Sequence, residues 1–331
     1  MSFKNVIITN NEKLSEIKKR IALGGAEKLQ VVSDFDKTLT RCFVDGTKIP
    51  SLISILRDEK YLTPDYPEEA QALYDKYHPM EIDPEIPLAE KKALMHSWWS
   101  EHYALLVKSG LTKNDLVRVA QSKKIALRPG ATEFMDFLHQ QGIPLVILSA
   151  AGLGFETIQM YLENHNALHE NIHIVSNVLQ WDEDGKAVGV EEPIIHTCNK
   201  NYAAVKDLEF FSAIRERKNI ILLGDGEGDA AMVEGFEYDN IIKIGFLNEG
   251  VAVDLEKFKD SYDVLVLHDG PMDYILKSFT NLFDVVIVND SPMDFVSVLL
   301  RELVSMKGVT DKGSVRAVNH EAWSRNLADK N

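Results

Sequence analysis

Runs of apolar residues alternate with segments of helical periodicity along most of the chain. An apolar run of strand length, bounded by Gly, Asp or Asn, is typical of a buried strand, and apolar residues three or four positions apart are typical of an amphipathic helix. This alternation predicts an α/β fold with a doubly wound parallel sheet. The predicted strands are residues 29–33, 143–148, 172–175, 219–223, 241–246 and 264–267, and the predicted helices are 11–23, 129–141, 155–164 and 201–215.

Residues 45–122 depart from this alternation. They have helical periodicity without a convincing strand, and they are rich in Glu, Lys, Tyr and Trp. Because this stretch follows the first predicted strand, we expect an inserted α-helical cap that forms a lid over an active site. Asp45-Gly46 is a hairpin-turn signal, and residues 182–185 form a predicted turn between extended segments. The predicted domains are a helical extension over 1–28, a core over 29–44 plus 123–280, the cap over 45–122, and a C-terminal part over 281–331.

An internal repeat spans the end of the predicted core and the start of the C-terminal part. Residues 262–279 match residues 283–300 at a constant offset of 21, and six of the 18 positions are identical. The repeat is a duplicated strand–helix unit, which fits either an added edge strand or two alternative final exons in one chain. A shorter connection costs less closure entropy. We therefore expect the first copy to pack in the core sheet, and the second copy to extend the edge or lie outside it, followed by a polar tail.

Composition narrows the function classes. Of the 331 residues, 45% are hydrophobic, enough for a sizeable core. The formal net charge of −15 argues against nucleic-acid binding, which needs clustered Lys and Arg. The sequence has neither a signal-peptide pattern nor an apolar run long enough for a membrane helix. The two cysteines, Cys42 and Cys198, suit a reducing compartment. We expect a cytoplasmic monomer with a small-molecule substrate and no nucleic-acid or membrane partner.

Polar side chains follow three of the predicted strands, where ligands bind in doubly wound sheets. A pair of carboxylates there can divide nucleophilic attack on phosphorus and proton transfer between them, and both supply oxygen ligands for Mg²⁺. Taken singly, each group also fits a helix cap or an acidic turn. The residues are Asp34 and Asp36 after the first strand, Ser149 after the second, and Asp225 and Asp229 after the fourth.

In this order the motifs resemble those of the haloacid dehalogenase phosphohydrolase superfamily. They are Asp-x-Asp-x-Thr, a Ser after a hydrophobic strand, a Lys, and Gly-Asp-x-x-x-Asp. The finer pattern is similar to one branch, the pyrimidine 5′-nucleotidase family, also called cytosolic 5′-nucleotidase III. The resemblance covers roughly residues 29–279 and implies a Rossmannoid core with a helical cap. The matching segments are 33–39, 81–84, 148–152, 196–200, 220–225, 242–248 and 260–263.

The resemblance implies how the reaction would run. Asp34 would be the nucleophile and form an aspartyl-phosphate. Asp36 would protonate the leaving ribose oxygen and then activate the water that hydrolyses the intermediate. The Asp34 and Asp225 carboxylates and the Asp36 backbone carbonyl would bind Mg²⁺, with Asp229 orienting the metal shell.

The resemblance also implies how the substrate would be held. Ser149, the N–H of Ala150 and the Lys200 ammonium would bind the phosphate, and Thr38 would support the nucleophile loop. In the cap, Glu81 resembles a substrate-contacting Glu, which can accept a hydrogen bond from an exocyclic amine or a ribose hydroxyl. Trp99 falls where the family has an aromatic residue near the base. His102 stands where the pyrimidine-specific members have a Ser, which leaves the base preference open.

The resemblance implies a Mg²⁺-dependent 5′-nucleotidase that acts on nucleoside monophosphates, CMP and UMP first, and can also pass the phosphoryl group to another nucleoside. One alternative is a relative specific for 7-methylguanosine monophosphate, whose cationic base would favour a Trp face. A second is a small-metabolite phosphatase, such as a phosphoserine phosphatase, whose cap would need cationic groups. A third is a non-catalytic metal- or nucleotide-binding module, against which the intact catalytic set argues.

Overall fold

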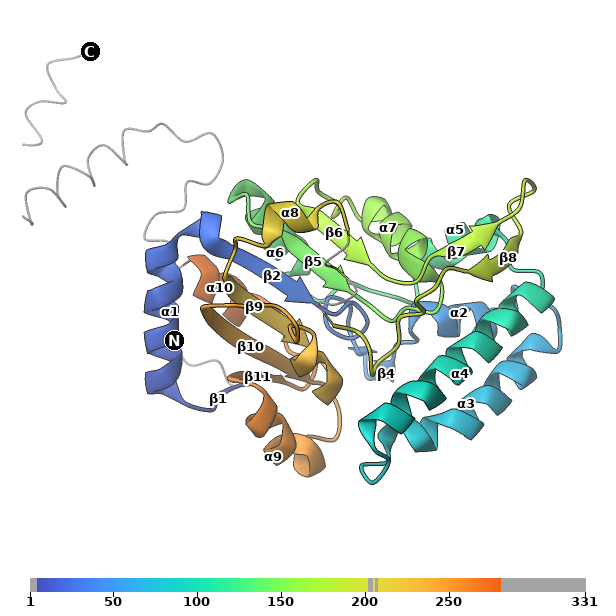
Figure 1. Ribbon diagram of the computed structural model, residues 1–331, viewed down its shortest axis with the longest axis horizontal. Helices are drawn as coiled ribbons and strands as arrows, with labels where there is room; N and C mark the ends of the chain where they lie inside the picture. The colour runs from blue at the N-terminus through green and yellow to red at the C-terminus, as the bar shows by residue number, and fades with distance from the viewer. Residues whose placement is uncertain (1–4, 202–204, 206–207, 281–331) are drawn as a thin grey trace, which may run out of the picture. The chain divides into compact units, whose positions relative to one another are not determined.

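A seven-stranded sheet forms the centre of the molecule, as seen in a computed structural model that describes residues 5–201, 205 and 208–280 (Figure 1). The strands run in the order β1-β11-β10-β9-β2-β5-β6. All neighbouring pairs are parallel except β1 with β11, which is antiparallel. The strands are β1 (Val6–Ile8), β2 (Leu29–Ser33), β5 (Leu145–Leu148), β6 (Ile172–Val175), β9 (Asn219–Gly224), β10 (Asn240–Leu247) and β11 (Val264–Leu267). The predicted α/β fold with a doubly wound parallel sheet is confirmed.

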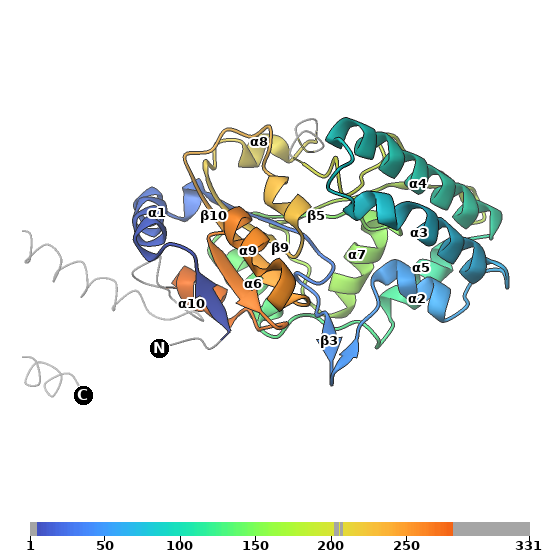
Figure 2. The same cartoon turned by 90° about the horizontal axis from the view of Figure 1, so that it is seen from below.

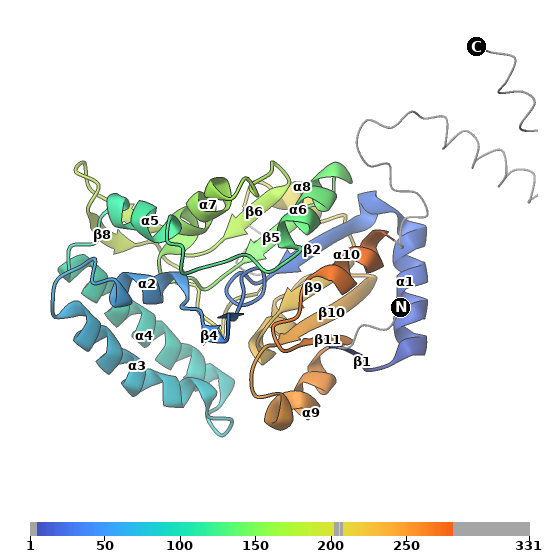
Figure 3. The ribbon, with the colours of Figure 1, turned by 180° about the vertical axis from the view of Figure 1, so that it is seen from behind.

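The central strands form the core because every residue of β2, β5 and β9 is buried. Strands covered on both faces read as continuous apolar runs, which made them visible in the sequence. Figures 1 and 3 view the sheet from opposite sides and show α8 on one side and α6 with α10 on the other. The helices around the sheet are α1 (Asn11–Gly24), α6 (Ala131–Gln140), α7 (Gly154–Asn164), α8 (Phe211–Ile214), α9 (Val251–Ser261) and α10 (Asp273–Thr280), with the 3₁₀ turns η1 (Ala26–Lys28) and η3 (Glu227–Ala231).

The stretch after β2 is helical, as expected. A small hairpin of β3 (Phe43–Val44) and β4 (Thr47–Lys48) comes first, at the predicted Asp45-Gly46 turn. The helices α2 (Leu52–Asp58), α3 (Tyr66–Ile82), α4 (Leu88–Lys108) and α5 (Lys113–Ala120) follow. Figure 2 shows these four helices together at one end of the sheet. We call α2–α5 the cap helices.

A second hairpin joins the cap helices although it lies far away in sequence. It consists of β7 (Leu179–Trp181) and β8 (Ala187–Val190), which flank the predicted turn at residues 182–185. Strand β8 packs against α4, and α5 packs against α7. The cap helices therefore contact two segments of the chain that follow β5.

Two predictions need correction. The N-terminal extension is not only helical, because Val6–Ile8 forms the edge strand β1, and three residues are too few to show an alternating pattern. Within the described residues, the helix predicted over 201–215 is helical only at Phe211–Ile214. None of the described helices is both long enough and apolar enough to span a membrane.

The first copy of the repeat packs in the core sheet, as predicted. It supplies β11, which lies between β10 and β1, and the helix α10. The second copy, residues 283–300, lies outside the described residues. Strand β1 already pairs with the outer edge of β11, at Val6↔Val266.

Candidate active site

The candidate nucleophile lies at the carboxyl end of the central strand β2. Asp34 is buried, with 6% of its surface exposed, and its N–H donates to the Leu223 carbonyl on β9 at 3.0 Å. The chain then turns tightly, with the N–H groups of Leu39 and Thr40 donating to the Phe35 carbonyl at 3.0 and 3.1 Å. This turn places Asp34 and Asp36 at the same end of the sheet.

A buried arginine stabilises this turn through hydrogen bonds to its backbone carbonyls. The Arg128 guanidinium is 1% exposed and donates to the backbone carbonyls of Lys37 and Thr38, the latter at 2.7 Å. It also lies 3.1 Å from the Asp269 carboxylate, which keeps the buried charge paired. Asp269 in turn accepts the N–H of Cys42 at 2.8 Å. The loop after β11 and the segment before α6 thus hold the turn that carries the two carboxylates.

Lys200 joins the candidate nucleophile to the turn after β9. Its ammonium donates to Oδ1 of Asp34 and, at 2.8 Å, to Oδ1 of Asp229. The other Asp229 oxygen accepts the N–H groups of Asp225 and Gly226, at 3.0 and 2.9 Å. Both Asp229 oxygens therefore hold other parts of the site in place.

The site concentrates negative charge away from water. Burial raises the pKa of the Asp34 carboxyl to about 7, against the opposing effect of Lys200. Burial, with Asp229 and Asp34 nearby, raises the pKa of Asp225 well above its usual value. Burial also raises the pKa of Asp36, although Lys37, Lys200 and the Leu52 N–H act against it. Burial alone would lower the pKa of Lys200, but Asp229 and Asp34 raise it above its usual value.

A divalent cation fits this cluster. Carboxylate oxygens of Asp34, Asp225 and Asp229 lie within 4.8 Å of one another. Among the described residues, the Asp225 carboxylate accepts no hydrogen bond and only Lys200 forms an ion pair with the cluster. Mg²⁺ takes one or two carboxylates and keeps several waters. The donor set therefore matches this ion, with Asp34 and Asp225 better placed than Asp229 for direct coordination.

The predicted phosphate-binding residues lie on the neighbouring strand. β5 pairs directly with β2, at Ser33↔Ile147, so Ser149 and Ala150 follow at the same edge as Asp34. Ser149 is 2% exposed, and its backbone N–H donates a hydrogen bond to the Val175 carbonyl on β6 at 3.0 Å. The buried Thr38 hydroxyl has no hydrogen-bond partner among the described residues. The β2–β5 pairing therefore places Ser149 and Ala150 at the strand edge where Lys200 contacts Asp34.

The cap helices bring Glu81 to this site. Glu81 Oε1 accepts the Thr197 hydroxyl at 2.9 Å, and Oε2 lies 3.0 Å from Nδ1 of His78 on the same helix. Thr197 lies three residues before Lys200 in the loop that follows β8. A side chain of the cap therefore contacts the loop that carries the candidate phosphate-binding lysine.

The two other predicted cap residues, Trp99 and His102, differ in how deeply they are buried. Trp99 is half-buried and contacts the ring of His102, with centroids 5.8 Å apart. His102 is 8% exposed, its Nε2 lies 3.4 Å from the Tyr66 hydroxyl, and burial lowers its pKa to about 4. A buried neutral imidazole behind Trp99 is placed to support that ring.

Sequence reasoning missed Arg128 and Thr197. The signal for Arg128 was a single charged residue at the end of the apolar run Ile125-Ala126-Leu127, just before Pro129-Gly130. Thr197 lay inside the segment that had already been singled out for Lys200. Neither contact could be read from local spacing, because each joins residues more than 85 positions apart.

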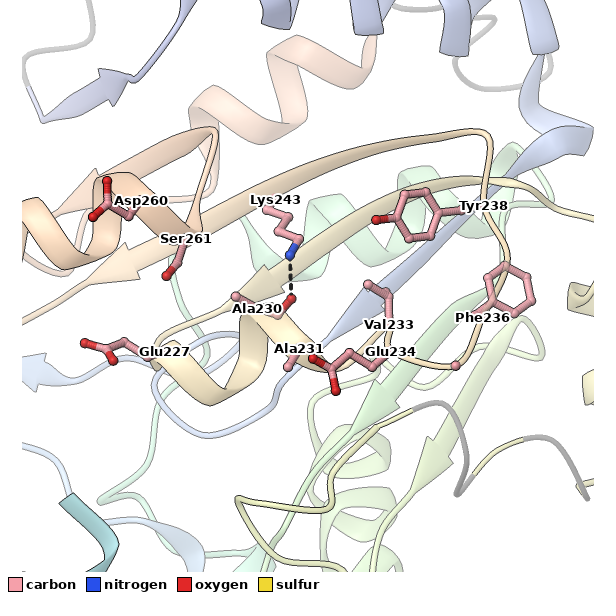
Figure 4. A pocket seen from close by; sticks show the side chains of 11 residues that line it. Glu227, Ala230, Ala231, Val233, Glu234, Phe236, Tyr238, Lys243, Asp260 and Ser261 are labelled. Carbon is pink, nitrogen blue, oxygen red and sulfur yellow. Dashed lines mark hydrogen bonds between the residues drawn. The ribbon is translucent and has the colours of Figure 1, made fainter. Parts of the chain in front are cut away.

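One pocket lies next to the turn after β9 (Figure 4). None of the predicted site residues lines it. Lys243 donates to the Ala230 carbonyl there at 2.7 Å, so its ammonium is engaged. Side chains around the pocket include Glu227, Val233, Glu234, Phe236, Tyr238 and Lys243. The pocket is distinct from the carboxylate cluster.

Comparisons with known proteins identify the family of this chain. Residues 37–278 match the family model described as pyrimidine 5′-nucleotidase (UMPH-1). The 7-methylguanosine phosphate-specific 5′-nucleotidase A of Xenopus laevis is 38% identical over 257 residues, covering 77% of this chain and 88% of that protein. The human 7-methylguanosine phosphate-specific 5′-nucleotidase is 36% identical over 271 residues, covering 82% and 90%.

Solved structures are similar to this chain as well. Cytosolic 5′-nucleotidase IIIB bound to cytidine matches with a TM-score of 0.76 and 32% identity, covering 85% of this chain and 94% of that one. A haloacid dehalogenase family hydrolase from Salmonella enterica has a TM-score of 0.50 at 14% identity, covers 75% of this chain and 70% of that one, and supports the fold alone. The chain belongs to the pyrimidine 5′-nucleotidase family, whose members are hydrolases with the haloacid dehalogenase fold.

Proposed function

We propose that this enzyme is a Mg²⁺-dependent nucleotidase that hydrolyses nucleoside 5′-monophosphates through an aspartyl-phosphate on Asp34. The Lys200 ammonium, which donates to both Asp34 and Asp229, carries the proposal. A phosphoryl group in front of Asp34 would meet a positive charge and several hydrogen-bond donors. Phosphoryl transfer needs mainly this positioning and charge neutralisation.

The residues divide the chemistry between two half-reactions. In the first, an Asp34 oxygen attacks phosphorus, the bond to the ribose 5′-oxygen breaks, and Asp36 gives that oxygen a proton. In the second, Asp36 takes a proton from water, whose oxygen attacks the phosphorus, and Asp34 leaves as a carboxylate. The raised pKa of Asp36 supports its part, because a general acid works best when its pKa lies near the working pH.

Mg²⁺ would be held by the Asp34 and Asp225 carboxylates and the Asp36 backbone carbonyl. When bound, it would neutralise charge on the phosphoryl oxygens and lower the repulsion between phosphate and Asp34. Asp229 would keep the turn after β9 in place through its hydrogen bonds to the Asp225 and Gly226 N–H groups. Ser149, the Ala150 N–H and Lys200 would bind the remaining phosphoryl oxygens, and Thr38 would support the turn after Asp34.

For the base, we place 7-methylguanosine monophosphate first and CMP second. The relatives are named for the first nucleotide, and the structural relative was solved with cytidine. The chain offers Glu81 as an acceptor for base N–H groups and Trp99 as an aromatic face. A methylated, cationic guanine would bind more tightly through both residues, through charge attraction to Glu81 and through cation–π attraction to Trp99. The sequence alone placed CMP and UMP first, so the order within this class is the part to be tested.

A phosphate-release assay tests the proposal. Purified enzyme with Mg²⁺ is given 7-methylguanosine monophosphate, CMP, UMP, GMP and phosphoserine, with Asp34→Asn as the matched inactive control. We expect the highest kcat/KM with 7-methylguanosine monophosphate and the lowest with phosphoserine. Release from phosphoserine above that from every nucleotide would contradict a nucleotidase, and CMP or UMP above 7-methylguanosine monophosphate would restore the sequence-based order.

We also propose that the enzyme transfers phosphate to nucleosides. A covalent phosphoryl group on Asp34 can be attacked by a 5′-hydroxyl in place of water. Incubation of CMP with isotopically labelled uridine should give labelled UMP. Labelled UMP at the level of the Asp34→Asn control would exclude transfer.

We also propose that the protein is a monomer and that it is located in the cytoplasm. The structural relative is called a cytosolic 5′-nucleotidase, and the negative net charge disfavours nucleic acids and anionic membranes as partners. Light scattering on the full chain tests the monomer, and cell fractionation tests the location. A mass of twice 37.3 kDa would contradict the first expectation.

A further inference from the structure

Gly152 lies where the cap helices meet the loop after β5. This loop begins with Ser149 and Ala150, the proposed phosphate-binding residues. A Cβ atom at position 152 would lie 2.7 Å from Cζ3 and 3.0 Å from Cη2 of Trp99, and it would also overlap with Cδ1 of Ile53. Ile53 belongs to α2 and Trp99 to α4. Two cap side chains therefore touch the backbone of this loop at a position without a side chain.

The backbone of Gly152 does not itself require glycine. Nine glycines of the described residues have a positive φ, and Gly152 is not one of them. An alanine could adopt this backbone conformation without strain. The absence of a side chain at position 152 leaves room for the Trp99 ring and for Ile53.

Trp99 has little freedom to move back from this contact. Its ring stacks on that of Trp98, with centroids 6.2 Å apart, and lies 5.9 Å from the ring of Tyr103. Tyr103 is 2% exposed and His102 lies behind the ring as well. A packed interior resists the insertion of even one extra carbon. A Cβ at position 152 would therefore displace the cap helices from the loop rather than only rotate the ring.

We propose that Gly152 is a positioning residue that sets how closely the cap helices approach the phosphate-binding loop, and so fixes the distance between the Trp99 ring and the phosphate. The proposal rests on the proposed function, in which Trp99 faces the base. A nucleoside monophosphate has a nearly fixed length between phosphate and base, so this distance decides whether both ends are bound at once. The contact gives Gly152 a role in selecting nucleotides over smaller phosphate esters.

The kinetic test compares Gly152→Ala with the wild-type enzyme on a nucleotide and on p-nitrophenyl phosphate. The nucleotide should lose about 10- to 100-fold in kcat/KM, mainly through KM, because a small displacement misplaces the base. The aryl phosphate should change by less than about twofold, because it does not need the base contact. Equal losses on both substrates would show that Gly152 only supports the loop, and unchanged kinetics would also overturn the proposal.

Two further variants make the test specific. Ile53→Ala removes Cδ1, one of the two groups that the new methyl would meet, so Gly152→Ala/Ile53→Ala should recover part of the nucleotide KM. Gly189→Ala is the matched control, since Gly189 also lacks a positive φ and its closest neighbour is the flexible end of the Gln180 side chain. A double variant no better than Gly152→Ala would contradict the steric explanation.

Fluorescence of Trp99 tests the contact without activity. Replacing Trp98, Trp181 and Trp323 by Phe leaves Trp99 as the only tryptophan. We expect Gly152→Ala to shift its emission, because the ring loses its contact with the loop, and Gly189→Ala to leave it unchanged. If the emission shifts but no nucleotide is hydrolysed by the wild-type enzyme, the proposed function fails while the contact stands. If the emission does not shift, the proposal about Gly152 fails.

Discussion

The Thr197 hydroxyl donates a hydrogen bond of 2.9 Å to Oε1 of Glu81. This contact joins α3 of the cap to the loop that ends at Lys200. The loop is held firmly, because the Asn177 side chain pairs with the backbone of Ile195 on both its N–H and its carbonyl, at 2.7 and 2.9 Å. The proposed base-reading carboxylate and the proposed phosphate-binding lysine are therefore linked through a short, ordered stretch of chain.

The first prediction follows from this link. Glu81→Ala should lower kcat/KM for nucleotides by about 10- to 100-fold, since a hydrogen bond to a charged group contributes about 1.5–3 kcal/mol. Trp99→Ala should act in the same direction. Thr197→Val keeps the shape of the side chain and should cost less, because Glu81 remains able to reach the base. Steady-state kinetics on CMP and p-nitrophenyl phosphate separate these cases, and equal losses on both substrates would mean that Glu81 and Trp99 are structural.

The second prediction concerns the two carboxylates after β2. Asp34→Asn should abolish turnover, because an amide cannot serve as the attacking carboxylate. Asp36→Asn should lower kcat by about 10²- to 10⁴-fold, the usual contribution of general acid–base catalysis. Mass spectrometry of enzyme quenched during turnover should find phosphate on Asp34. Phosphate found on another residue would overturn the assignment of the nucleophile.

The third prediction concerns metal removal. Activity should vanish in EDTA and return with Mg²⁺, whereas Ca²⁺ should support little activity because it prefers more ligands and looser geometry. Asp229→Asn should raise the Mg²⁺ concentration needed for half-maximal activity by about 10- to 100-fold, as expected for a residue that orients a ligand. Asp184→Asn, on the exposed turn of the β7–β8 hairpin, is the control. Full activity in the chelator would contradict a metal-assisted reaction.

The fourth prediction uses the buried His102. Its pKa is lowered from 6.5 to about 4, chiefly by burial, so between these values the unfolded chain binds a proton that the folded chain does not. Stability must then fall as the pH is lowered from 6.5 to about 4, by about 3 kcal/mol for this one group. His102→Asn should reduce that fall, measured by urea unfolding at pH 4.5 and 7.

A matched variant checks the source of the effect. His96 lies on the same helix with 48% of its side chain exposed, so His96→Asn should leave the pH dependence close to that of the wild-type protein. If both variants flatten the profile equally, burial of His102 is not the cause.

Much of this fold could be predicted because its central strands are buried on both faces. β2 and β11 were predicted at their observed bounds, and α7 to within one residue. Asp34, Asp225 and Asp229 were predicted together because parallel strands end at one edge, and their oxygens do lie within 4.8 Å of one another. The edge strand β1 was missed, because the strand that it pairs with among the described residues, Val264–Leu267, is more than 250 residues away. Contacts such as Arg128 with the Thr38 carbonyl depend on the finished fold, so no local pattern predicts them.

The first copy of the repeat is needed for the site. Asp269 accepts the N–H groups of Cys42 and Phe43 at 2.8 and 3.1 Å and pairs with Arg128, and the Tyr262 hydroxyl donates to the Gly226 carbonyl in the turn after β9. The second copy keeps an Asp at the position of Asp269, but it has Phe283 in place of Tyr262 and Ser291 in place of Gly270. A Cβ at Gly270 would lie 2.7 Å from a Val266 methyl and 3.1 Å from the Leu267 carbonyl. The second sequence is therefore less suited to this place in the sheet.

The last prediction is that truncation after Asn281 leaves a folded, active enzyme. The described sheet is complete without residues 283–300, because β11 pairs with β10 on one side and with β1 on the other. The proposed site residue that comes last in the chain is Asp229, well before the truncation point. The truncated enzyme should match the full chain in kcat/KM for CMP and in melting temperature, whereas deletion of residues 262–279 should abolish folding. Unfolding or inactivation of the truncated chain would mean that the second copy belongs to the core, and that the shorter connection of the first copy does not decide which copy the sheet takes up.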